Sequence, residues 1–169
     1  GESINVSGKL ATSIKKRPLP NSSDLIDVTS EDVCLANIEI SNYRSKLIPC
    51  QVSLSSISKN GRGFSLEIYG SEGSLILKSE NQKDYVHGFN LKYSNKKNKI
   101  QNLTADSSFN FEKTWSDGRI APVLRIQNSW AKSIFNKTPI IPGLCEGLSS
   151  HKVCEAIKES SKSGLSIKI

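Results

Sequence analysis

Residues 63–77 alternate apolar and polar side chains on either side of a glycine-rich turn, and this pattern constrains the fold more than any other in the chain. Phe64, Leu66 and Ile68 are separated by single residues of more polar character, as in a strand with one buried face. Residues 70–73 then place two glycines at a reversal, where glycine adopts positive φ without steric cost. The alternation resumes after the turn. The sequence therefore predicts a β-hairpin.

The order of the other elements predicts the fold class. Period-two alternation predicts further strands over residues 4–14, 34–40, 48–54, 85–93 and, more weakly, 100–103. From residue 120 to 135, apolar residues recur every three or four positions, which predicts an amphipathic helix. A second helix is predicted from Ser150, a suitable N-cap, to a stop at Gly164, followed by a closing strand over 165–169. This order predicts an α+β domain: a large, open, mainly antiparallel sheet with two helices packed on one face.

The four cysteines show no metal or redox spacing. There is no C-x-x-C motif, and Cys34 and Cys50 fall at inward positions of predicted strands, where free cysteine acts as a small hydrophobic residue. The N-terminus does not resemble a signal peptide, and no apolar run approaches the ~20 residues of a membrane span. We therefore expect a cytoplasmic protein. Because the chain contains no Met, even at its start, we also expect a fragment or a processed chain.

The formal net charge of +7 raises the question of nucleic-acid binding. Proteins that follow a phosphate backbone concentrate Lys and Arg on one face and interleave aromatic residues. Here the basic residues are scattered, and the densest run, at 94–99, is typical of a polar hairpin tip. A solvated basic surface is favoured over a nucleic-acid interface, whose affinity would fall steeply with salt.

Reactive motifs are missing from the chain. The sequence contains no G-x-G-x-x-G turn between a strand and a helix, no G-x-S-x-G and no H-E-x-x-H, and its two histidines are too few for a three-histidine metal site. His87 is expected to be a core or interface residue, and His151 to lie in the first turn of the second helix. The adjacent acids Glu31 and Asp32 would point to opposite faces of a strand, so a role at strand entry is favoured over an acid–base pair.

Three stretches, in this order, resemble the C-terminal domain of the glucose-fructose oxidoreductase / inositol dehydrogenase (Gfo/Idh/MocA) family of NAD(P)-dependent oxidoreductases. The first is VSGKLATSIKKRP at residues 6–18. The second is VTSED at 28–32 together with the hairpin IYGSEGSL at 68–75. The third is PGLCEG at 142–147, leading into VCEAIKESSKSG at 153–164. The resemblance implies a C-terminal domain of the kind found in dihydrodipicolinate reductase.

The resemblance also implies what lies outside this chain. Family members carry an N-terminal Rossmann domain, a Glu-Lys-Pro motif and an Asp-x-x-x-His pair, and none of these maps onto residues 1–169. We therefore assign no catalytic, cofactor-binding or metal residue here. Residues 1–169 are expected to be a single substrate and oligomerisation domain, inactive alone. The parent protein is expected to use NAD or NADP, without a metal, on a sugar or cyclitol hydroxyl.

Two further expectations follow from the resemblance. Lys16 and Arg17, which leave the first strand at a loop, are candidate contacts to the substrate or the cofactor, although a solvated loop is the alternative. The family commonly packs its sheet against a second subunit, which implies a homodimer or homotetramer. The polar residues expected on that face are Ser53, Ser55, Ser65, Glu67 and Tyr69. The competing interpretation is a non-catalytic sheet module that dimerises or binds carbohydrate.

Overall fold

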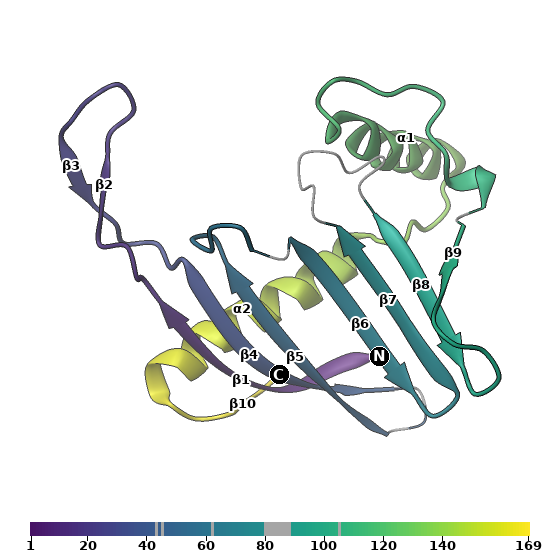
Figure 1. Cartoon of the computed structure of the whole chain (residues 1–169), viewed down its shortest axis with the longest axis horizontal. Helices are drawn as coiled ribbons and strands as arrows, with labels where there is room; N and C mark the ends of the chain where they lie inside the picture. Colours follow the sequence, from purple (N-terminus) through teal and green to yellow (C-terminus); the bar gives the residue numbers. More distant parts are fainter. Residues whose placement is uncertain (43, 45, 62, 80–88, 105) are drawn as a thin grey trace. The chain divides into compact units, whose positions relative to one another are not determined.

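The computed structural model describes residues 1–42, 44, 46–61, 63–79, 89–104 and 106–169. They form an α+β fold, as predicted (Figure 1). The strands are β1 (Glu2–Ala11), β2 (Lys16–Pro18), β3 (Leu25–Asp27), β4 (Val33–Ser41), β5 (Leu47–Ser55), β6 (Phe64–Gly70), β7 (Gly73–Ser79), β8 (Asn90–Asn95), β9 (Gln101–Leu103) and β10 (Ile167–Lys168). The helices are the 3-10 turn η1 (Ser107–Phe109), α1 (Ile120–Asn136) and α2 (Leu144–Ser163). None of the helices among the described residues is long and apolar enough to cross a membrane.

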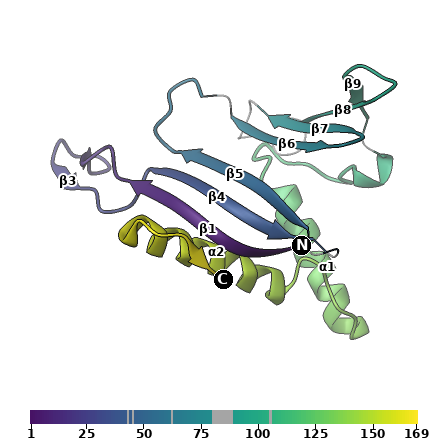
Figure 2. The same ribbon diagram turned by 90° about the horizontal axis from the view of Figure 1, so that it is seen from below.

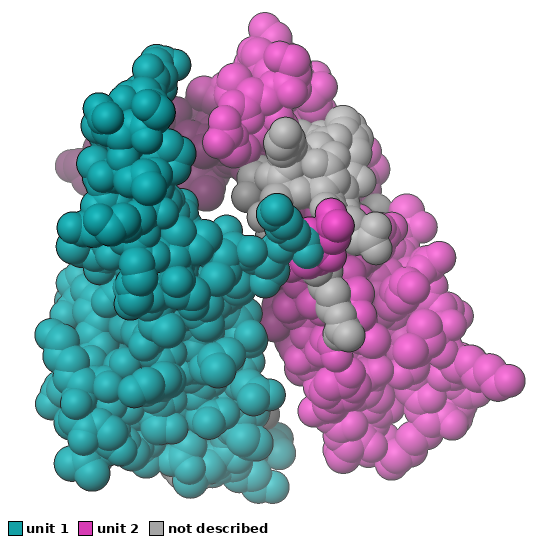
Figure 3. Space-filling model, turned by 60° about the vertical axis from the view of Figure 1, so that its left-hand side comes forward, with its two compact units in different colours: residues 1–59, 141–169 teal, residues 60–140 magenta. Residues whose placement is uncertain are grey.

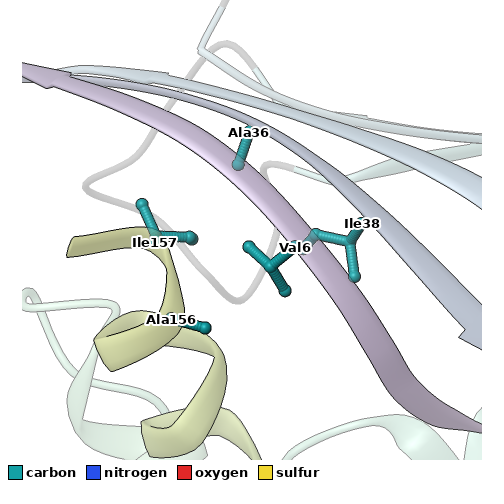
Figure 4. Close-up of a cluster of buried hydrophobic side chains, with 5 residues drawn as sticks. All are labelled: Val6, Ala36, Ile38, Ala156 and Ile157. Atoms are coloured by element: carbon teal, nitrogen blue, oxygen red, sulfur yellow. The ribbon is translucent and has the colours of Figure 1, made fainter. Parts of the chain in front are cut away.

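The chain divides into two compact units, coloured separately in Figure 3. The first comprises residues 1–59 and 141–169, and the second comprises residues 60–140. In the first unit, an antiparallel sheet of order β10-β1-β4-β5 lies against α2, which covers one of its faces (Figure 2). The core lies between them and consists of Val6, Ala36, Ile38, Ala156 and Ile157 (Figure 4).

This core confirms the inward faces predicted for the first two strands. Val6 is fully buried, and its β4 partner Ile38 is 9% exposed. Cys34 and Cys50 pack against the same cluster as free, half-buried thiols, as expected of small hydrophobic residues. Burial raises the pKa of the Cys34 thiol, which keeps it in the uncharged form.

Helix α2 approaches β1 closely and protects its edge. A Cβ atom on Gly8 would lie 2.9 Å from Cγ2 of Ile157, so glycine at this position permits the close approach. Strand β10 pairs with β1 only at Asn5 and Val6. Beyond that point the N–H of Gly8 donates to Oγ of Ser160, and the N–H of Leu10 donates to Oγ of Ser161, each at 2.9 Å. Helix side chains thus take the place of a strand at this sheet edge.

The helix α2 begins before the predicted N-cap. The carboxylate of Glu146 accepts the N–H of Gly143 at 2.7 Å, so the first turn forms at residue 144. The prediction that Ser150 caps the helix was wrong, because Ser150 lies inside it and donates to the carbonyl of Glu146 at 3.0 Å. His151 therefore lies in the middle of the helix, with its side chain exposed, and not in the first turn as predicted. The predicted stop is confirmed, since Gly164 adopts φ 74° as the C-cap.

Alanine should have opposite effects on stability at two glycines, Gly147 within α2 and Gly164 at its C-cap. Gly147 lies within the helix and an added Cβ would meet nothing within 4 Å, so Gly147→Ala should raise the free energy of unfolding by about 0.5–1 kcal/mol. Gly164→Ala should instead lower it by about 1 kcal/mol, because alanine is strained at positive φ. Urea unfolding followed by circular dichroism measures both changes. A destabilised Gly147→Ala variant would show that this glycine is required for packing.

The second unit contains the hairpin that the sequence predicted most clearly. Its sheet has the order β6-β7-β8-β9 and is antiparallel throughout, with Gly70 paired to Gly73 at the first turn. The strand predicted over 85–93 is seen from Asn90 as β8, whereas Tyr85 and His87 lie outside the described residues. The weaker strand over 100–103 is confirmed as β9, paired with β8.

The strand pairing differs from the prediction in one respect, because the pairings among the described residues do not join all the strands into one large sheet. The described pairings give two four-stranded sheets and a two-stranded β2–β3 ribbon. The chain leaves β5 at Ser55 and enters β6 at Phe64 after a segment with positive φ at Asn60 and Gly63, and no described pairing joins these two strands. Only local alternation is visible in the sequence, so it could not show where one sheet ends. Of the two helices, α2 packs on the first sheet, whereas α1 belongs to the second unit.

Candidate functional site

Lys16 and Arg17 lie side by side on an exposed ribbon that leaves the first sheet between β1 and β4 (Figure 1). The ribbon is the hairpin of β2 and β3, in which Lys16 pairs with Asp27 and Arg17 with Ile26. The Lys16 ammonium forms an ion pair with the Asp27 carboxylate at 3.3 Å, with both side chains largely exposed. Lys16 is therefore partly neutralised within the ribbon.

Asp32 fixes the base of this ribbon. Its two carboxylate oxygens accept the N–H groups of Ser13 and Ile14, each at 2.8 Å. Its own N–H donates to the carbonyl of Ala11 at 2.9 Å, and the residue is only 6% exposed. The predicted role at strand entry is thus confirmed for Asp32, while Glu31 is exposed. A single side chain ends β1 and sets the direction in which the Lys16–Arg17 ribbon leaves the sheet.

These hydrogen bonds make the stability of the fold depend on the charge of Asp32. The N–H donors of Ile14 and Ser13 lower the pKa of Asp32 from its ordinary value of 3.8. Because the folded-state pKa is the lower one, the stabilisation is fully present above pH 3.8 and is lost as the pH falls through the folded-state pKa. Asp32→Asn can accept only one of the two N–H groups, since its amide nitrogen is a donor.

We therefore expect Asp32→Asn to have a lower urea midpoint than the unaltered chain at neutral pH. This difference should shrink as the pH is taken below 3.8. The matched control is Asp27→Asn, which removes an exposed ion pair and should leave the midpoint nearly unchanged. Equal midpoints for Asp32→Asn and the unaltered chain at neutral pH, or a difference independent of pH, would contradict this role.

The polar face of β6 is a second predicted feature. Ser65, Glu67 and Tyr69 share one face, where Glu67 accepts the Tyr69 hydroxyl at 2.6 Å and the Ser65 hydroxyl at 3.2 Å. Lys78 on β7 adds an ion pair at 3.1 Å. The Tyr69 hydroxyl and then Lys78 lower the pKa of Glu67. Ser53 and Ser55, which were predicted on the same face, lie on β5 in the other four-stranded sheet.

A cavity of about 410 Å³ in the second unit was missed by the sequence analysis. It lies between the segment 108–115 and one face of α1. The side chains that α1 contributes include Arg125, Asn128, Ser129 and Lys132. The last three follow Arg125 by three, four and seven residues, which places all four on one helical face. This spacing can be read from the sequence, but only the apolar residues of the same helix were considered there.

The described part of the chain contains neither a metal-binding cluster nor the turn between a parallel strand and a helix at which dinucleotides bind. Among the described residues, no group of three or more His, Cys, Asp or Glu side chains is placed to hold a metal ion. Dinucleotides bind at the carboxyl ends of parallel strands, at a glycine-rich turn into a helix. Every strand pairing among the described residues is antiparallel. The described residues therefore contain no dinucleotide site of this parallel-strand type.

The comparison with known proteins identifies the family. The profile described as "Oxidoreductase family, C-terminal alpha/beta domain" (Gfo/Idh/MocA) matches residues 5–169. The chain belongs to the Gfo/Idh/MocA oxidoreductase family. It is 37% identical over 161 residues to an uncharacterized oxidoreductase of Synechocystis sp., covering 95% of this chain and 42% of that relative.

Solved structures of oxidoreductases share the fold. A levoglucosan dehydrogenase in complex with NADH and L-sorbose has a TM-score of 0.72 and 16% identity, covering all of this chain and 46% of the other. An NAD binding oxidoreductase from Klebsiella pneumoniae has a TM-score of 0.71 and 18% identity over the same shares. The chain thus spans less than half the length of these Gfo/Idh/MocA proteins and corresponds to their C-terminal part.

Proposed function

We propose that residues 1–169 are the single C-terminal, substrate-side and oligomerisation domain of a longer NAD(P)-dependent dehydrogenase that acts on a hydroxyl group of a sugar or cyclitol. The observation that carries the proposal is the family match over nearly the whole chain. The similarity to a levoglucosan dehydrogenase that binds NADH and L-sorbose supports a sugar-like substrate. The similarity to oxidoreductases whose structures hold NAD or NADH supports a nicotinamide cofactor in the longer protein.

The proposed reaction is the oxidation of a secondary alcohol. The carbon that bears the hydroxyl loses a hydride to NAD(P)⁺, and the hydroxyl loses its proton to a base, which gives a carbonyl group and NAD(P)H. The nicotinamide supplies the hydride chemistry, and the base lies outside this chain. The residues of this chain bind the polyol, orient it and exclude water from one side.

Lys16 and Arg17 are the proposed contacts to the substrate or to the cofactor side. Arg17 is the stronger candidate, because Lys16 is already paired with Asp27, whereas Arg17 has no ion pair with another described residue. In the full-length protein, Arg17→Ala should raise KM by about tenfold with a smaller change in kcat. Lys97→Ala, on an exposed turn, removes the same charge and should change neither. Equal kinetics for Arg17→Ala and the unaltered enzyme would remove Arg17 from the site.

The proposed oligomer forms through polar sheet faces. The β6 face has its polar groups fixed in advance by the Ser65–Glu67–Tyr69 hydrogen bonds. The face of the first sheet opposite α2 carries a hollow of about 590 Å³ where Asn5 donates to Glu39 at 2.7 Å. Ordered polar faces of this kind suit a self-complementary contact between copies.

The test compares two proteins, the isolated chain and the full-length product of its gene. With a panel of sugars and cyclitols, absorbance of NAD(P)H should change only for the full-length protein. Calorimetry should detect NAD(P) binding only there as well. Micromolar binding of NAD(P) by residues 1–169 would contradict the placement of the cofactor site. Cofactor binding without turnover of any polyol would favour the non-catalytic sheet module.

A further inference from the structure

We propose that the cavity between segment 108–115 and α1 binds a carbohydrate that carries a carboxylate or phosphate group. The site lies within the second unit and depends on residues 108–132 alone. It does not rest on the proposed dehydrogenase activity, because binding here can be measured without any cofactor.

The segment before α1 supplies two aromatic rings, each paired with a cation. The Arg125 guanidinium lies 3.9 Å from the centroid of the Phe111 ring, and its Nη2 donates to the carbonyl of Asn110. The Lys113 ammonium lies 5.1 Å from the centroid of the Trp115 ring. Cation–π contacts of this kind hold long side chains in place, so the charges of Arg125 and Lys113 are ordered before a ligand arrives.

The helix supplies a matching polar face. Arg125, Asn128, Ser129 and Lys132 follow one another at helical spacing and all line the cavity. Asn128 offers a donor and an acceptor of the type that sugar hydroxyls require, and the Ser129 hydroxyl, which donates to the carbonyl of Arg125 at 2.9 Å, offers an acceptor. Of the charged residues that line the cavity, Lys113, Arg125 and Lys132 are cationic and only Glu112 is acidic. The lining therefore favours an anion.

The volume of the cavity and the residues that line it together indicate the class of ligand. A volume of about 410 Å³ falls within the range of ~300–1,000 Å³ that is common for small-molecule sites. The half-buried Trp115 ring presents an apolar surface for the C–H face of a pyranose. Lys113 and Lys132 would pair with an acidic substituent, and the side-chain amide and hydroxyl with the ring hydroxyls. A carboxylate and a phosphate share this chemistry, so both belong to the proposal.

Tryptophan fluorescence of the 169-residue chain tests the site. The chain contains two tryptophans, so a Trp130→Phe background leaves Trp115 as the only reporter. The probes are glucose 6-phosphate, glucuronate, neutral glucose and inorganic phosphate. We expect saturable changes with glucose 6-phosphate, glucuronate or both, and affinity at least about tenfold weaker for glucose and for inorganic phosphate.

Charge-matched variants locate the binding. Lys113→Ala and Lys132→Ala should each weaken binding by about tenfold, whereas Lys99→Ala, which removes an exposed charge outside the cavity, should not. A stronger response to one of the two acidic sugars identifies which acid group the site prefers. The proposal is overturned if no acidic sugar gives a saturable change, if glucose or inorganic phosphate binds equally well, or if Lys99→Ala weakens binding as much as the cavity variants.

Discussion

Ser160→Ala is expected to lower the free energy of unfolding by about 2 kcal/mol. Ser160 is only 2% exposed, and its hydroxyl accepts the N–H of Gly8 at 2.9 Å and donates to the carbonyl of Leu165 at 2.6 Å. Alanine lacks this hydroxyl, so the N–H of Gly8 in β1 and the carbonyl of Leu165 after α2 both lose their hydrogen-bond partner. A buried polar group left in this state costs about 1–3 kcal/mol, and most of the effect falls on the N–H of Gly8, because Leu165 is 66% exposed.

Urea unfolding of three serine variants separates this effect from helix propensity. Ser161→Ala removes one bond, to the N–H of Leu10, at a half-buried position and should cost about 1 kcal/mol. Ser149→Ala, on an exposed part of α2, should leave the stability unchanged or raise it slightly. If Ser160→Ala behaved like Ser149→Ala, the proposed protection of the β1 edge would be wrong.

Gly73→Ala is expected to lower the free energy of unfolding by about 3 kcal/mol. The added Cβ would lie 2.0 Å from the carbonyl oxygen of Ser94 and 3.1 Å from Cα of Asn95. Both are backbone atoms of the neighbouring strand β8 and cannot move like a side-chain end, so β7 and β8 must separate at this point. The change therefore acts on the strand pairing of the second sheet.

Gly70→Ala is the matched control, at the other end of the same turn. Its Cβ would meet only the carbonyl oxygen of Gly73, at 3.6 Å, which is an ordinary contact. It should cost less than about 1 kcal/mol. Thermal unfolding of both variants, with amide exchange of β8 as a local probe, gives the comparison. Equal stability of the two variants would show that the approach of β8 does not require glycine at 73.

The elements that sequence predicted well are those whose patterns are local. Val6 and Ile38 lie inward because strand alternation alone decides which face they occupy. Gly164 ends α2 because the C-cap there adopts positive φ, a condition that glycine meets without strain. The family resemblance rested on the same segments and is confirmed over residues 5–169.

The features that sequence did not predict depend on contacts between distant residues. Ser150 is a plausible cap by residue type, but Glu146 binds the N–H of Gly143 and starts the helix earlier. Nothing in the local sequence distinguishes Ser160 from other helical serines, because its partner Gly8 lies far away in the sequence. The cavity residues Arg125 and Lys132 were not singled out from the sequence, because the segment that faces them has no regular pattern.

Deuterium transfer in the full-length protein tests the dehydrogenase proposal most directly. NADH or NADPH deuterated at C4 of the nicotinamide is supplied with a panel of ketoses, aldoses and cyclitol ketones, and the products are analysed by mass spectrometry. We expect deuterium on the newly formed carbinol carbon of at least one polyol. A folded, cofactor-bound protein that transfers deuterium to none of them would contradict the assignment of this chain to a sugar or cyclitol dehydrogenase.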